Sequence, residues 1–155
     1  MNKAFIPLCL SSALLLSACG GGGAPVPVPA PQPQPLNAST NIGKVNISVR
    51  PNAVDVGSVT LQIPASGTVQ VTFAGNGVVS PGDRLVLAAS DTSKTWGVNE
   101  GNVSIEASAP FTHTRVYSVT AGSKTFYAVA QNYVKTSGTG IVSIYATLTA
   151  TFYPN

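Results

Sequence analysis

The sequence predicts an all-β fold, a single antiparallel β-sandwich over residues 42–155. Two observations support this prediction. Apolar and polar residues alternate with a period of two, as in Val45, Ile47 and Val49, which are separated by Asn46 and Ser48. Turn-forming segments separate the alternating runs, and no stretch has convincing helical periodicity. A region of this length can bury one hydrophobic core.

The strands are expected in order along the chain, one for each alternating run. After 45–49 the runs cover 59–63, 69–73, 85–87, 103–105, 114–120, 124–134 and 141–153. The turns between them are at 64–67, 75–77, 80–83, 121–123 and 137–140. Eight or so short strands favour a jelly-roll-like sandwich. An immunoglobulin-like sandwich is the alternative, although the Cys–Trp–Cys signature of true immunoglobulin domains is missing.

The N-terminus has the features of a secretory signal peptide, expected over residues 1–18. Lys3 is followed by an apolar run, and small residues precede Cys19. The run is too short to span a bilayer. The segment Leu16-Ser17-Ala18-Cys19 resembles the bacterial lipobox. That resemblance implies acylation of Cys19, which becomes the mature N-terminus, and Gly20 after it implies sorting to the outer membrane. We therefore expect a lipid-anchored protein of the bacterial cell envelope.

A Gly- and Pro-rich linker is expected over residues 19–41. Prolines alternate with other residues from Pro25 to Pro35. Because each proline fixes its own φ and favours an extended predecessor, this segment should form a polyproline II helix. At about 3.1 Å per residue it spans roughly 34 Å. The linker is therefore interpreted as a semi-rigid spacer between the lipid and the domain.

The charge pattern argues against a nucleic-acid partner. Only 8% of the residues are charged and the formal net charge is +3, whereas typical domains have about 25% charged residues. The basic residues are scattered singly and form no stripe. The surface is expected to consist mainly of Ser, Thr, Asn and Gln.

The sequence contains no convincing catalytic or cofactor motif. His113 is the only histidine, and Cys9 and Cys19 are the only cysteines. A zinc site needs three or four ligands, so His113 is interpreted as a structural or surface residue. Residues 122–125 are interpreted as a hairpin turn, because the spacing of a phosphate loop fails there. We expect no enzyme, metal or cofactor.

The best ligand-binding candidate is Trp96, which lies between two polar loops. An indole can stack on a sugar while Asp91, Asn99 and Glu100 bind its hydroxyls. The competing interpretation is that Trp96 folds back and covers one end of the sandwich. The same loops offer part of a calcium ligand set, but a solvated loop is favoured. A hydrolase using Asp91 and Glu100 is a weaker alternative, since glycoside hydrolysis needs carboxyls about 5–10 Å apart.

In strand count, size and final strand pair, the domain resembles the jelly-roll heads of the complement C1q and tumour-necrosis-factor type. Heads of that type commonly form trimers, so the resemblance implies self-association. If runs 124–134 and 141–153 pair, Tyr127, Tyr133 and Tyr145 form an outward aromatic patch. The alternative is that these tyrosines are ordinary surface residues. The expected function is a non-catalytic binding or structural, adhesive module that contacts a protein partner, a glycan or itself.

Overall fold

The computed structural model describes residues 36–48, 52–96, 101–134 and 142–155. All of them belong to one compact unit, Gln32–Asn155. Cys19, Asn99 and Glu100 lie outside the described residues. Within the ranges that the structure describes, no helix is long and apolar enough to cross a membrane.

The described chain forms eight strands, at the positions where the alternating runs predict them. They are β1 (Leu36–Ile47), β2 (Val54–Ile63), β3 (Gly67–Val78), β4 (Asp83–Ser90), β5 (Val103–Ile105), β6 (Ala109–Val119), β7 (Gly122–Val134) and β8 (Val142–Pro154).

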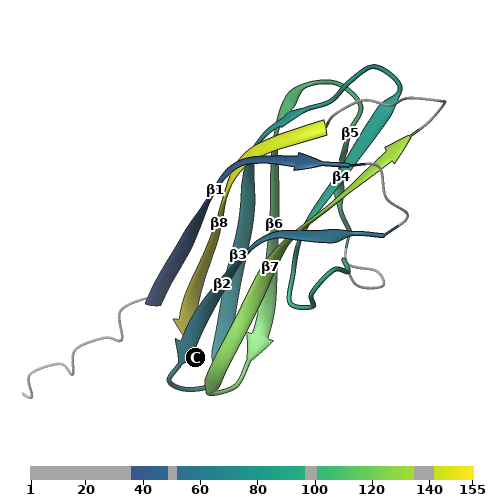
Figure 1. Ribbon diagram of the computed structural model, residues 1–155. Coiled ribbons are helices and arrows are strands. Elements are labelled where there is room, and N and C mark those ends of the chain that lie inside the picture. The colour runs from purple at the N-terminus through teal and green to yellow at the C-terminus, as the bar shows by residue number, and fades with distance from the viewer. Residues whose placement is uncertain (1–35, 49–51, 97–100, 135–141) are drawn as a thin grey trace, which may run out of the picture. The chain divides into compact units, whose positions relative to one another are not determined.

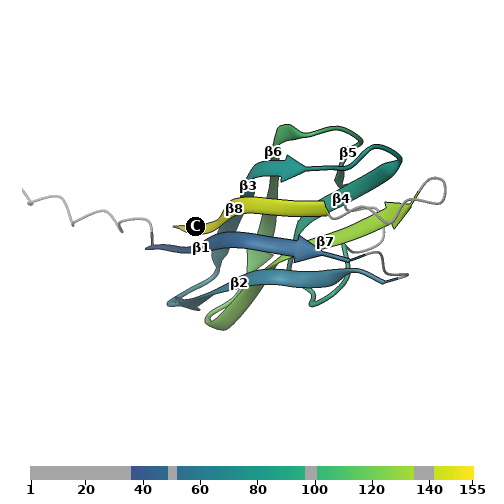
Figure 2. The same cartoon turned by 45° about the horizontal axis from the view of Figure 1, so that its top comes forward.

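The strands form two four-stranded antiparallel sheets. The first sheet has the order β1-β8-β3-β6 and the second sheet has the order β2-β7-β4-β5. Figures 1 and 2 show β1 beside β8 and β2 beside β7. Except at β4 and β5, each strand lies in the opposite sheet from the strand that follows it. This is a jelly roll, as predicted, and it excludes the immunoglobulin-like alternative, in which neighbouring strands such as A and B share a sheet.

The boundary predicted between linker and domain is six residues too late. The sequence predicts residues 36–41 in the linker, but they form the first half of β1 and pair with the end of β8. Leu36 is opposite Phe152, and Ala38 packs against the hydrophobic core. The alternation of apolar and polar residues is too weak here to predict a strand. Asn37, Ser39 and Asn41 are polar, and the residues that alternate with them include the small Ala38 and the polar Thr40.

The hydrophobic core lies between the two sheets. Its largest fully buried side chains include Phe73, Phe126 and Phe152. The ring of Phe73 meets the ring of Phe111 edge to face, with centroids 5.0 Å apart. Removing such a buried aromatic ring typically costs about 3–5 kcal/mol. The core needs no disulfide, in keeping with the absence of cysteine after residue 19.

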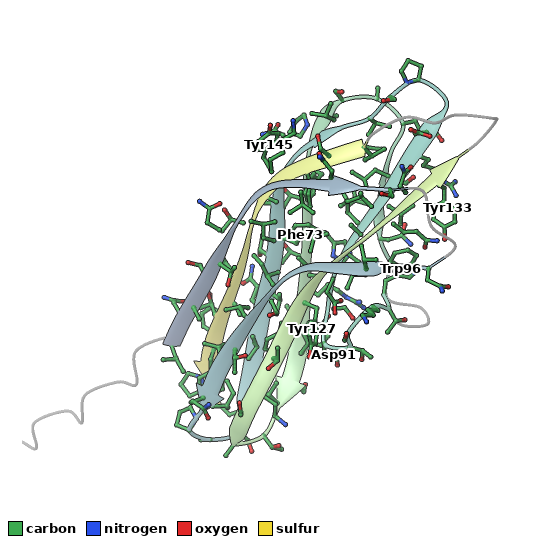
Figure 3. All side chains as sticks on the ribbon, in the orientation of Figure 1. Phe73, Asp91, Trp96, Tyr127, Tyr133 and Tyr145 are labelled. Atoms are coloured by element: carbon green, nitrogen blue, oxygen red, sulfur yellow. The ribbon has the colours of Figure 1, made fainter. Side chains whose placement is uncertain are left out.

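The last two strands do not pair with each other, so the condition for the tyrosine patch is not met. β7 pairs with β2 and β4, whereas β8 pairs with β1 and β3. The turn between β6 and β7, and the return to β8, each carry the chain from one sheet to the other. Tyr127 and Tyr133 therefore lie on the second sheet, Tyr145 lies on the first, and the three do not form one patch (Figure 3).

Two side chains from the first sheet close the exposed edge of β4. β5 is so short that it pairs only with Leu85–Leu87. Beyond that point the N–H of Ala89 donates to Nδ1 of His113 at 2.9 Å, and the hydroxyl of Tyr117 donates to the carbonyl of Ala89 at 3.2 Å. His113 therefore has a structural role, because it satisfies a backbone group that β5 leaves without a strand partner.

Candidate functional site

The candidate site is built on the loop that follows β4, here called the strap (residues 91–96). The strap leaves β4 at Ser90 and is tied to Asp55 on β2. The carboxylate of Asp55 accepts the N–H of Lys94 at 2.7 Å and also accepts the hydroxyl of Ser93. Since β7 lies between β4 and β2, the strap crosses the outer face of the second sheet.

The start of the strap has a fixed local conformation. The hydroxyl of Ser90 accepts the N–H of Thr92 at 3.0 Å and donates to the carbonyl of Thr92 at 2.9 Å. Lys94 has a φ of 58°, which is a left-handed conformation that non-glycine residues rarely adopt. Such a conformation costs about 1–3 kcal/mol and persists when surrounding contacts hold it. The bonds to Asp55 provide those contacts.

The strap explains why β4 and the neighbouring part of β7 are buried on both faces. Leu85 and Leu87 point into the core, but the alternate residues Val86 and Ala88 are buried as well, and so is Val129 on β7. An antiparallel sheet usually has one face in water. Here the strap covers part of the outer face. Both faces of β4 are therefore shielded from water, in keeping with its apolar run from Leu85 to Ala89.

At the end of the strap, Trp96 forms one wall of a pocket of about 410 Å³. Trp96 is half-buried, and Gln131 of β7, only 3% exposed, contributes to the lining from the outer face of the sheet. The other lining residues are Asn52, Ala53, Lys94 and Thr95. The pocket thus combines an indole face with amide, hydroxyl and ammonium groups, which suits a polar ligand with one apolar face.

Of the predicted ligand set, the structure describes Trp96 and Asp91, and these two residues line different pockets. Asp91 is exposed and lines a separate pocket of about 370 Å³ with residues of β6 and β7, among them Tyr127. Figure 3 shows Asp91 beside Tyr127 and Trp96 farther along the strap. Asn99 and Glu100 lie outside the described residues, so the carboxyl pair required for a hydrolase stays a prediction. Of the predicted ligand residues that the structure describes, Trp96 lines this pocket and Asp91 does not.

Sequence reasoning missed three residues that build the site: Asp55, Asn52 and Gln131. The sequence signal for Gln131 was present. The adjacent polar residues Gln131 and Asn132 interrupt the run 126–130, whose residues are all apolar, and both are buried in the structure. Asp55 has no such signal, because its role depends on a loop that is distant in the sequence.

The remaining predicted residues have separate environments. Tyr133 lies beneath Arg84, whose guanidinium is 5.0 Å from the ring centroid. Tyr145 is 46% exposed on the outer face of the first sheet. Among the residues that the structure describes, no group of three or more His, Cys, Asp or Glu side chains could hold a metal ion.

Comparisons with known proteins bear on the fold alone. No protein-family model matches the chain, and no curated protein matches it. Among solved structures, the chain is similar to the crystal structure of the infectious bursal disease virus VP2 subviral particle, with a TM-score of 0.51 and 9% identity. The match covers 84% of this chain but 37% of the VP2 chain. At that identity, the likeness supports the jelly roll and says nothing about function.

Proposed function

We propose that this chain is a lipid-anchored lipoprotein of the bacterial envelope whose jelly roll is a non-catalytic binding module for a glycan. The observation that carries the glycan assignment is the position of Trp96. Its indole lies at the wall of a pocket, on a strap tethered to Asp55, instead of in the core between the sheets.

The pocket chemistry favours a sugar over a fully apolar ligand. A sugar ring has an apolar face that stacks on an indole and hydroxyls that pair with amides. Gln131 and Asn52 provide the amides, and Thr95 adds a hydroxyl. Among the described residues of the lining, Lys94 is the one that is charged. The pocket volume lies within the usual range for small-ligand sites, about 300–1,000 Å³.

The anchor is supported by the sequence motif at Cys19. More than one acyl chain is needed for stable membrane attachment, because each buried methylene contributes only about 0.8 kcal/mol. With Gly20 after Cys19, the lipoprotein sorting pattern favours the outer membrane. The proline-rich spacer then holds the Trp96 pocket away from the lipid surface. At that distance the pocket can bind glycans of the envelope.

A glycan array tests the binding proposal. The wild-type chain and Trp96→Ala are applied in parallel, with Tyr145→Ala as a control from the opposite sheet. We expect binding to at least one neutral glycan, its loss in Trp96→Ala and its retention in Tyr145→Ala. Equal binding by wild type and Trp96→Ala would contradict the proposal, as would no binding by the wild type.

A further inference from the structure

A second site lies between the two sheets, away from the strap. The side chains of Asp83 and Asn132 are almost fully buried, with 1% and 0% exposure. Three oxygens, both of Asp83 and Oδ1 of Asn132, have no hydrogen-bond partner among the residues that the structure describes. Buried polar atoms without partners are rare in proteins, so these three oxygens require an explanation.

The strand register brings the two side chains to the same face. On β4, Asp83 alternates with the core residues Leu85 and Leu87 and therefore points inward. Asn132 of β7 is opposite Leu85, while Asp83 is opposite Val134. Asp83 and Asn132 are thus diagonal neighbours, whose Cα atoms are typically about 7–8 Å apart. Figure 1 shows the start of β4 beside the end of β7.

One hydrogen bond holds the side chain of Asn132, and another holds the backbone of Asp83. Nδ2 of Asn132 donates to the carbonyl of Ile47 on β1 at 3.2 Å. Since that carbonyl can only accept, the amide orientation is determined and the oxygen is the atom left over. The N–H of Asp83 donates to the carbonyl of Ser80 at 3.1 Å, closing a turn in which Gly82 has a φ of 88°. This turn places Asp83 as the first residue of β4.

We propose that Asp83 and Asn132 bind a hard divalent cation, with calcium as the best-suited ion. An ionised carboxylate without partners is strongly unfavourable in a core, and a cation removes that penalty. Carboxylate and amide oxygens are the ligands that calcium prefers, and water or backbone carbonyls complete its shell of six to eight oxygens. Because Asn132 also contacts β1, the ion would stabilise the contact between the two sheets at this end.

Calcium-dependent melting of the full chain in detergent tests this site. The chain is stripped with EDTA and then melted with 10 mM calcium or with sodium chloride of the same ionic strength. A single carboxylate predicts weak binding, with a dissociation constant of about 1 mM. Binding of that strength should raise the melting temperature by about 5 °C.

Two matched variants locate the effect. Asp83→Asn keeps the size of the side chain but removes its charge, and it should abolish the calcium-dependent shift. Asp91→Asn removes an exposed carboxylate from the strap and should leave the shift intact. A wild type that does not respond to calcium would overturn the proposal, and so would a full response in Asp83→Asn. A shift lost only in Asp91→Asn would also overturn it, because the ion would then belong to the strap.

A second measurement keeps the proposal testable if Asp83→Asn does not fold. Calorimetric titration of the wild type and of Asn132→Thr with calcium chloride then replaces the melting comparison. Loss of the amide oxygen should weaken binding at least five-fold. Unchanged affinity in Asn132→Thr, or no heat of binding in the wild type, would overturn the assignment.

Discussion

The backbone N–H of Lys94 donates a hydrogen bond to the carboxylate of Asp55 at 2.7 Å, although β7 lies between β2, which carries Asp55, and β4, from which the strap begins. This bond and the one from Ser93 hold the strap over the second sheet. They also hold Lys94, which lines the pocket together with Trp96. The ligand site therefore depends on an acidic side chain that makes no contribution to the pocket lining.

Replacing Asp55 should release the strap. Asp55→Ala removes the acceptor of both bonds, and because Asp55 is half-buried we expect a loss of about 1–2 kcal/mol in the free energy of unfolding. Trp96 should become more exposed, which shifts its fluorescence emission to longer wavelength. Asp91→Ala is the control, since its carboxylate accepts only the neighbouring Thr92 hydroxyl in the described structure. An unchanged emission maximum in Asp55→Ala would show that the strap is held by other contacts.

The closure of the β4 edge by Tyr117 can be measured separately. Tyr117→Phe keeps the ring contact with Phe126, whose centroid is 5.3 Å away, but removes the hydrogen bond to the carbonyl of Ala89. We expect the free energy of unfolding in urea to fall by about 1 kcal/mol. Tyr153→Phe, at an exposed tyrosine, should have no effect. Equal stabilities for the two variants would count against the bond.

The lipid anchor is tested by labelling cells with a fatty-acid analogue. Cys19→Ala should abolish labelling and leave an unlipidated precursor or a soluble form, because no other cysteine follows residue 19. Ser17→Ala, which leaves Cys19 in place, should still be labelled. Label that persists in Cys19→Ala would disprove acylation at this residue.

Self-association should use the first sheet. Its outer face exposes Tyr145, Tyr153 and Val116, the last of them at 66%. These side chains are the apolar groups expected at an interface. The mass of the domain, residues 32–155, can be measured by light scattering at micromolar concentration. We expect an oligomer that Tyr145→Glu dissociates and that Tyr133→Glu, on the second sheet, does not. A monomer in all three proteins would exclude this interface.

The strands and the jelly-roll class could be predicted because alternation is a local signal. Val69, Val71 and Phe73 are apolar in the sequence and fully buried in the structure. The strands with which β7 and β8 pair could not be predicted. Each of the two strands could belong to either sheet, and its sequence does not determine which. The start of β1 was missed because polar residues fill most of residues 36–41.

The candidate site was only partly predictable for the same reason. Trp96 was recognised from its residue type and from the polar loops around it. Its neighbours Asn52 and Gln131 come from distant parts of the chain, and they meet Trp96 only because the strap crosses β7. Strand register makes Asp83 and Asn132 diagonal neighbours, and alternation alone does not determine that register.

The most direct test of the proposed function is the fluorescence of Trp96, the only tryptophan in the chain. Its emission reports on the pocket alone, so a panel of neutral glycans can be titrated without any added label. We predict a saturable shift to shorter wavelength with at least one glycan, as the sugar displaces water from the indole. Gln131→Leu, which removes an amide from the lining, should weaken that titration. Emission that no glycan alters would contradict the account.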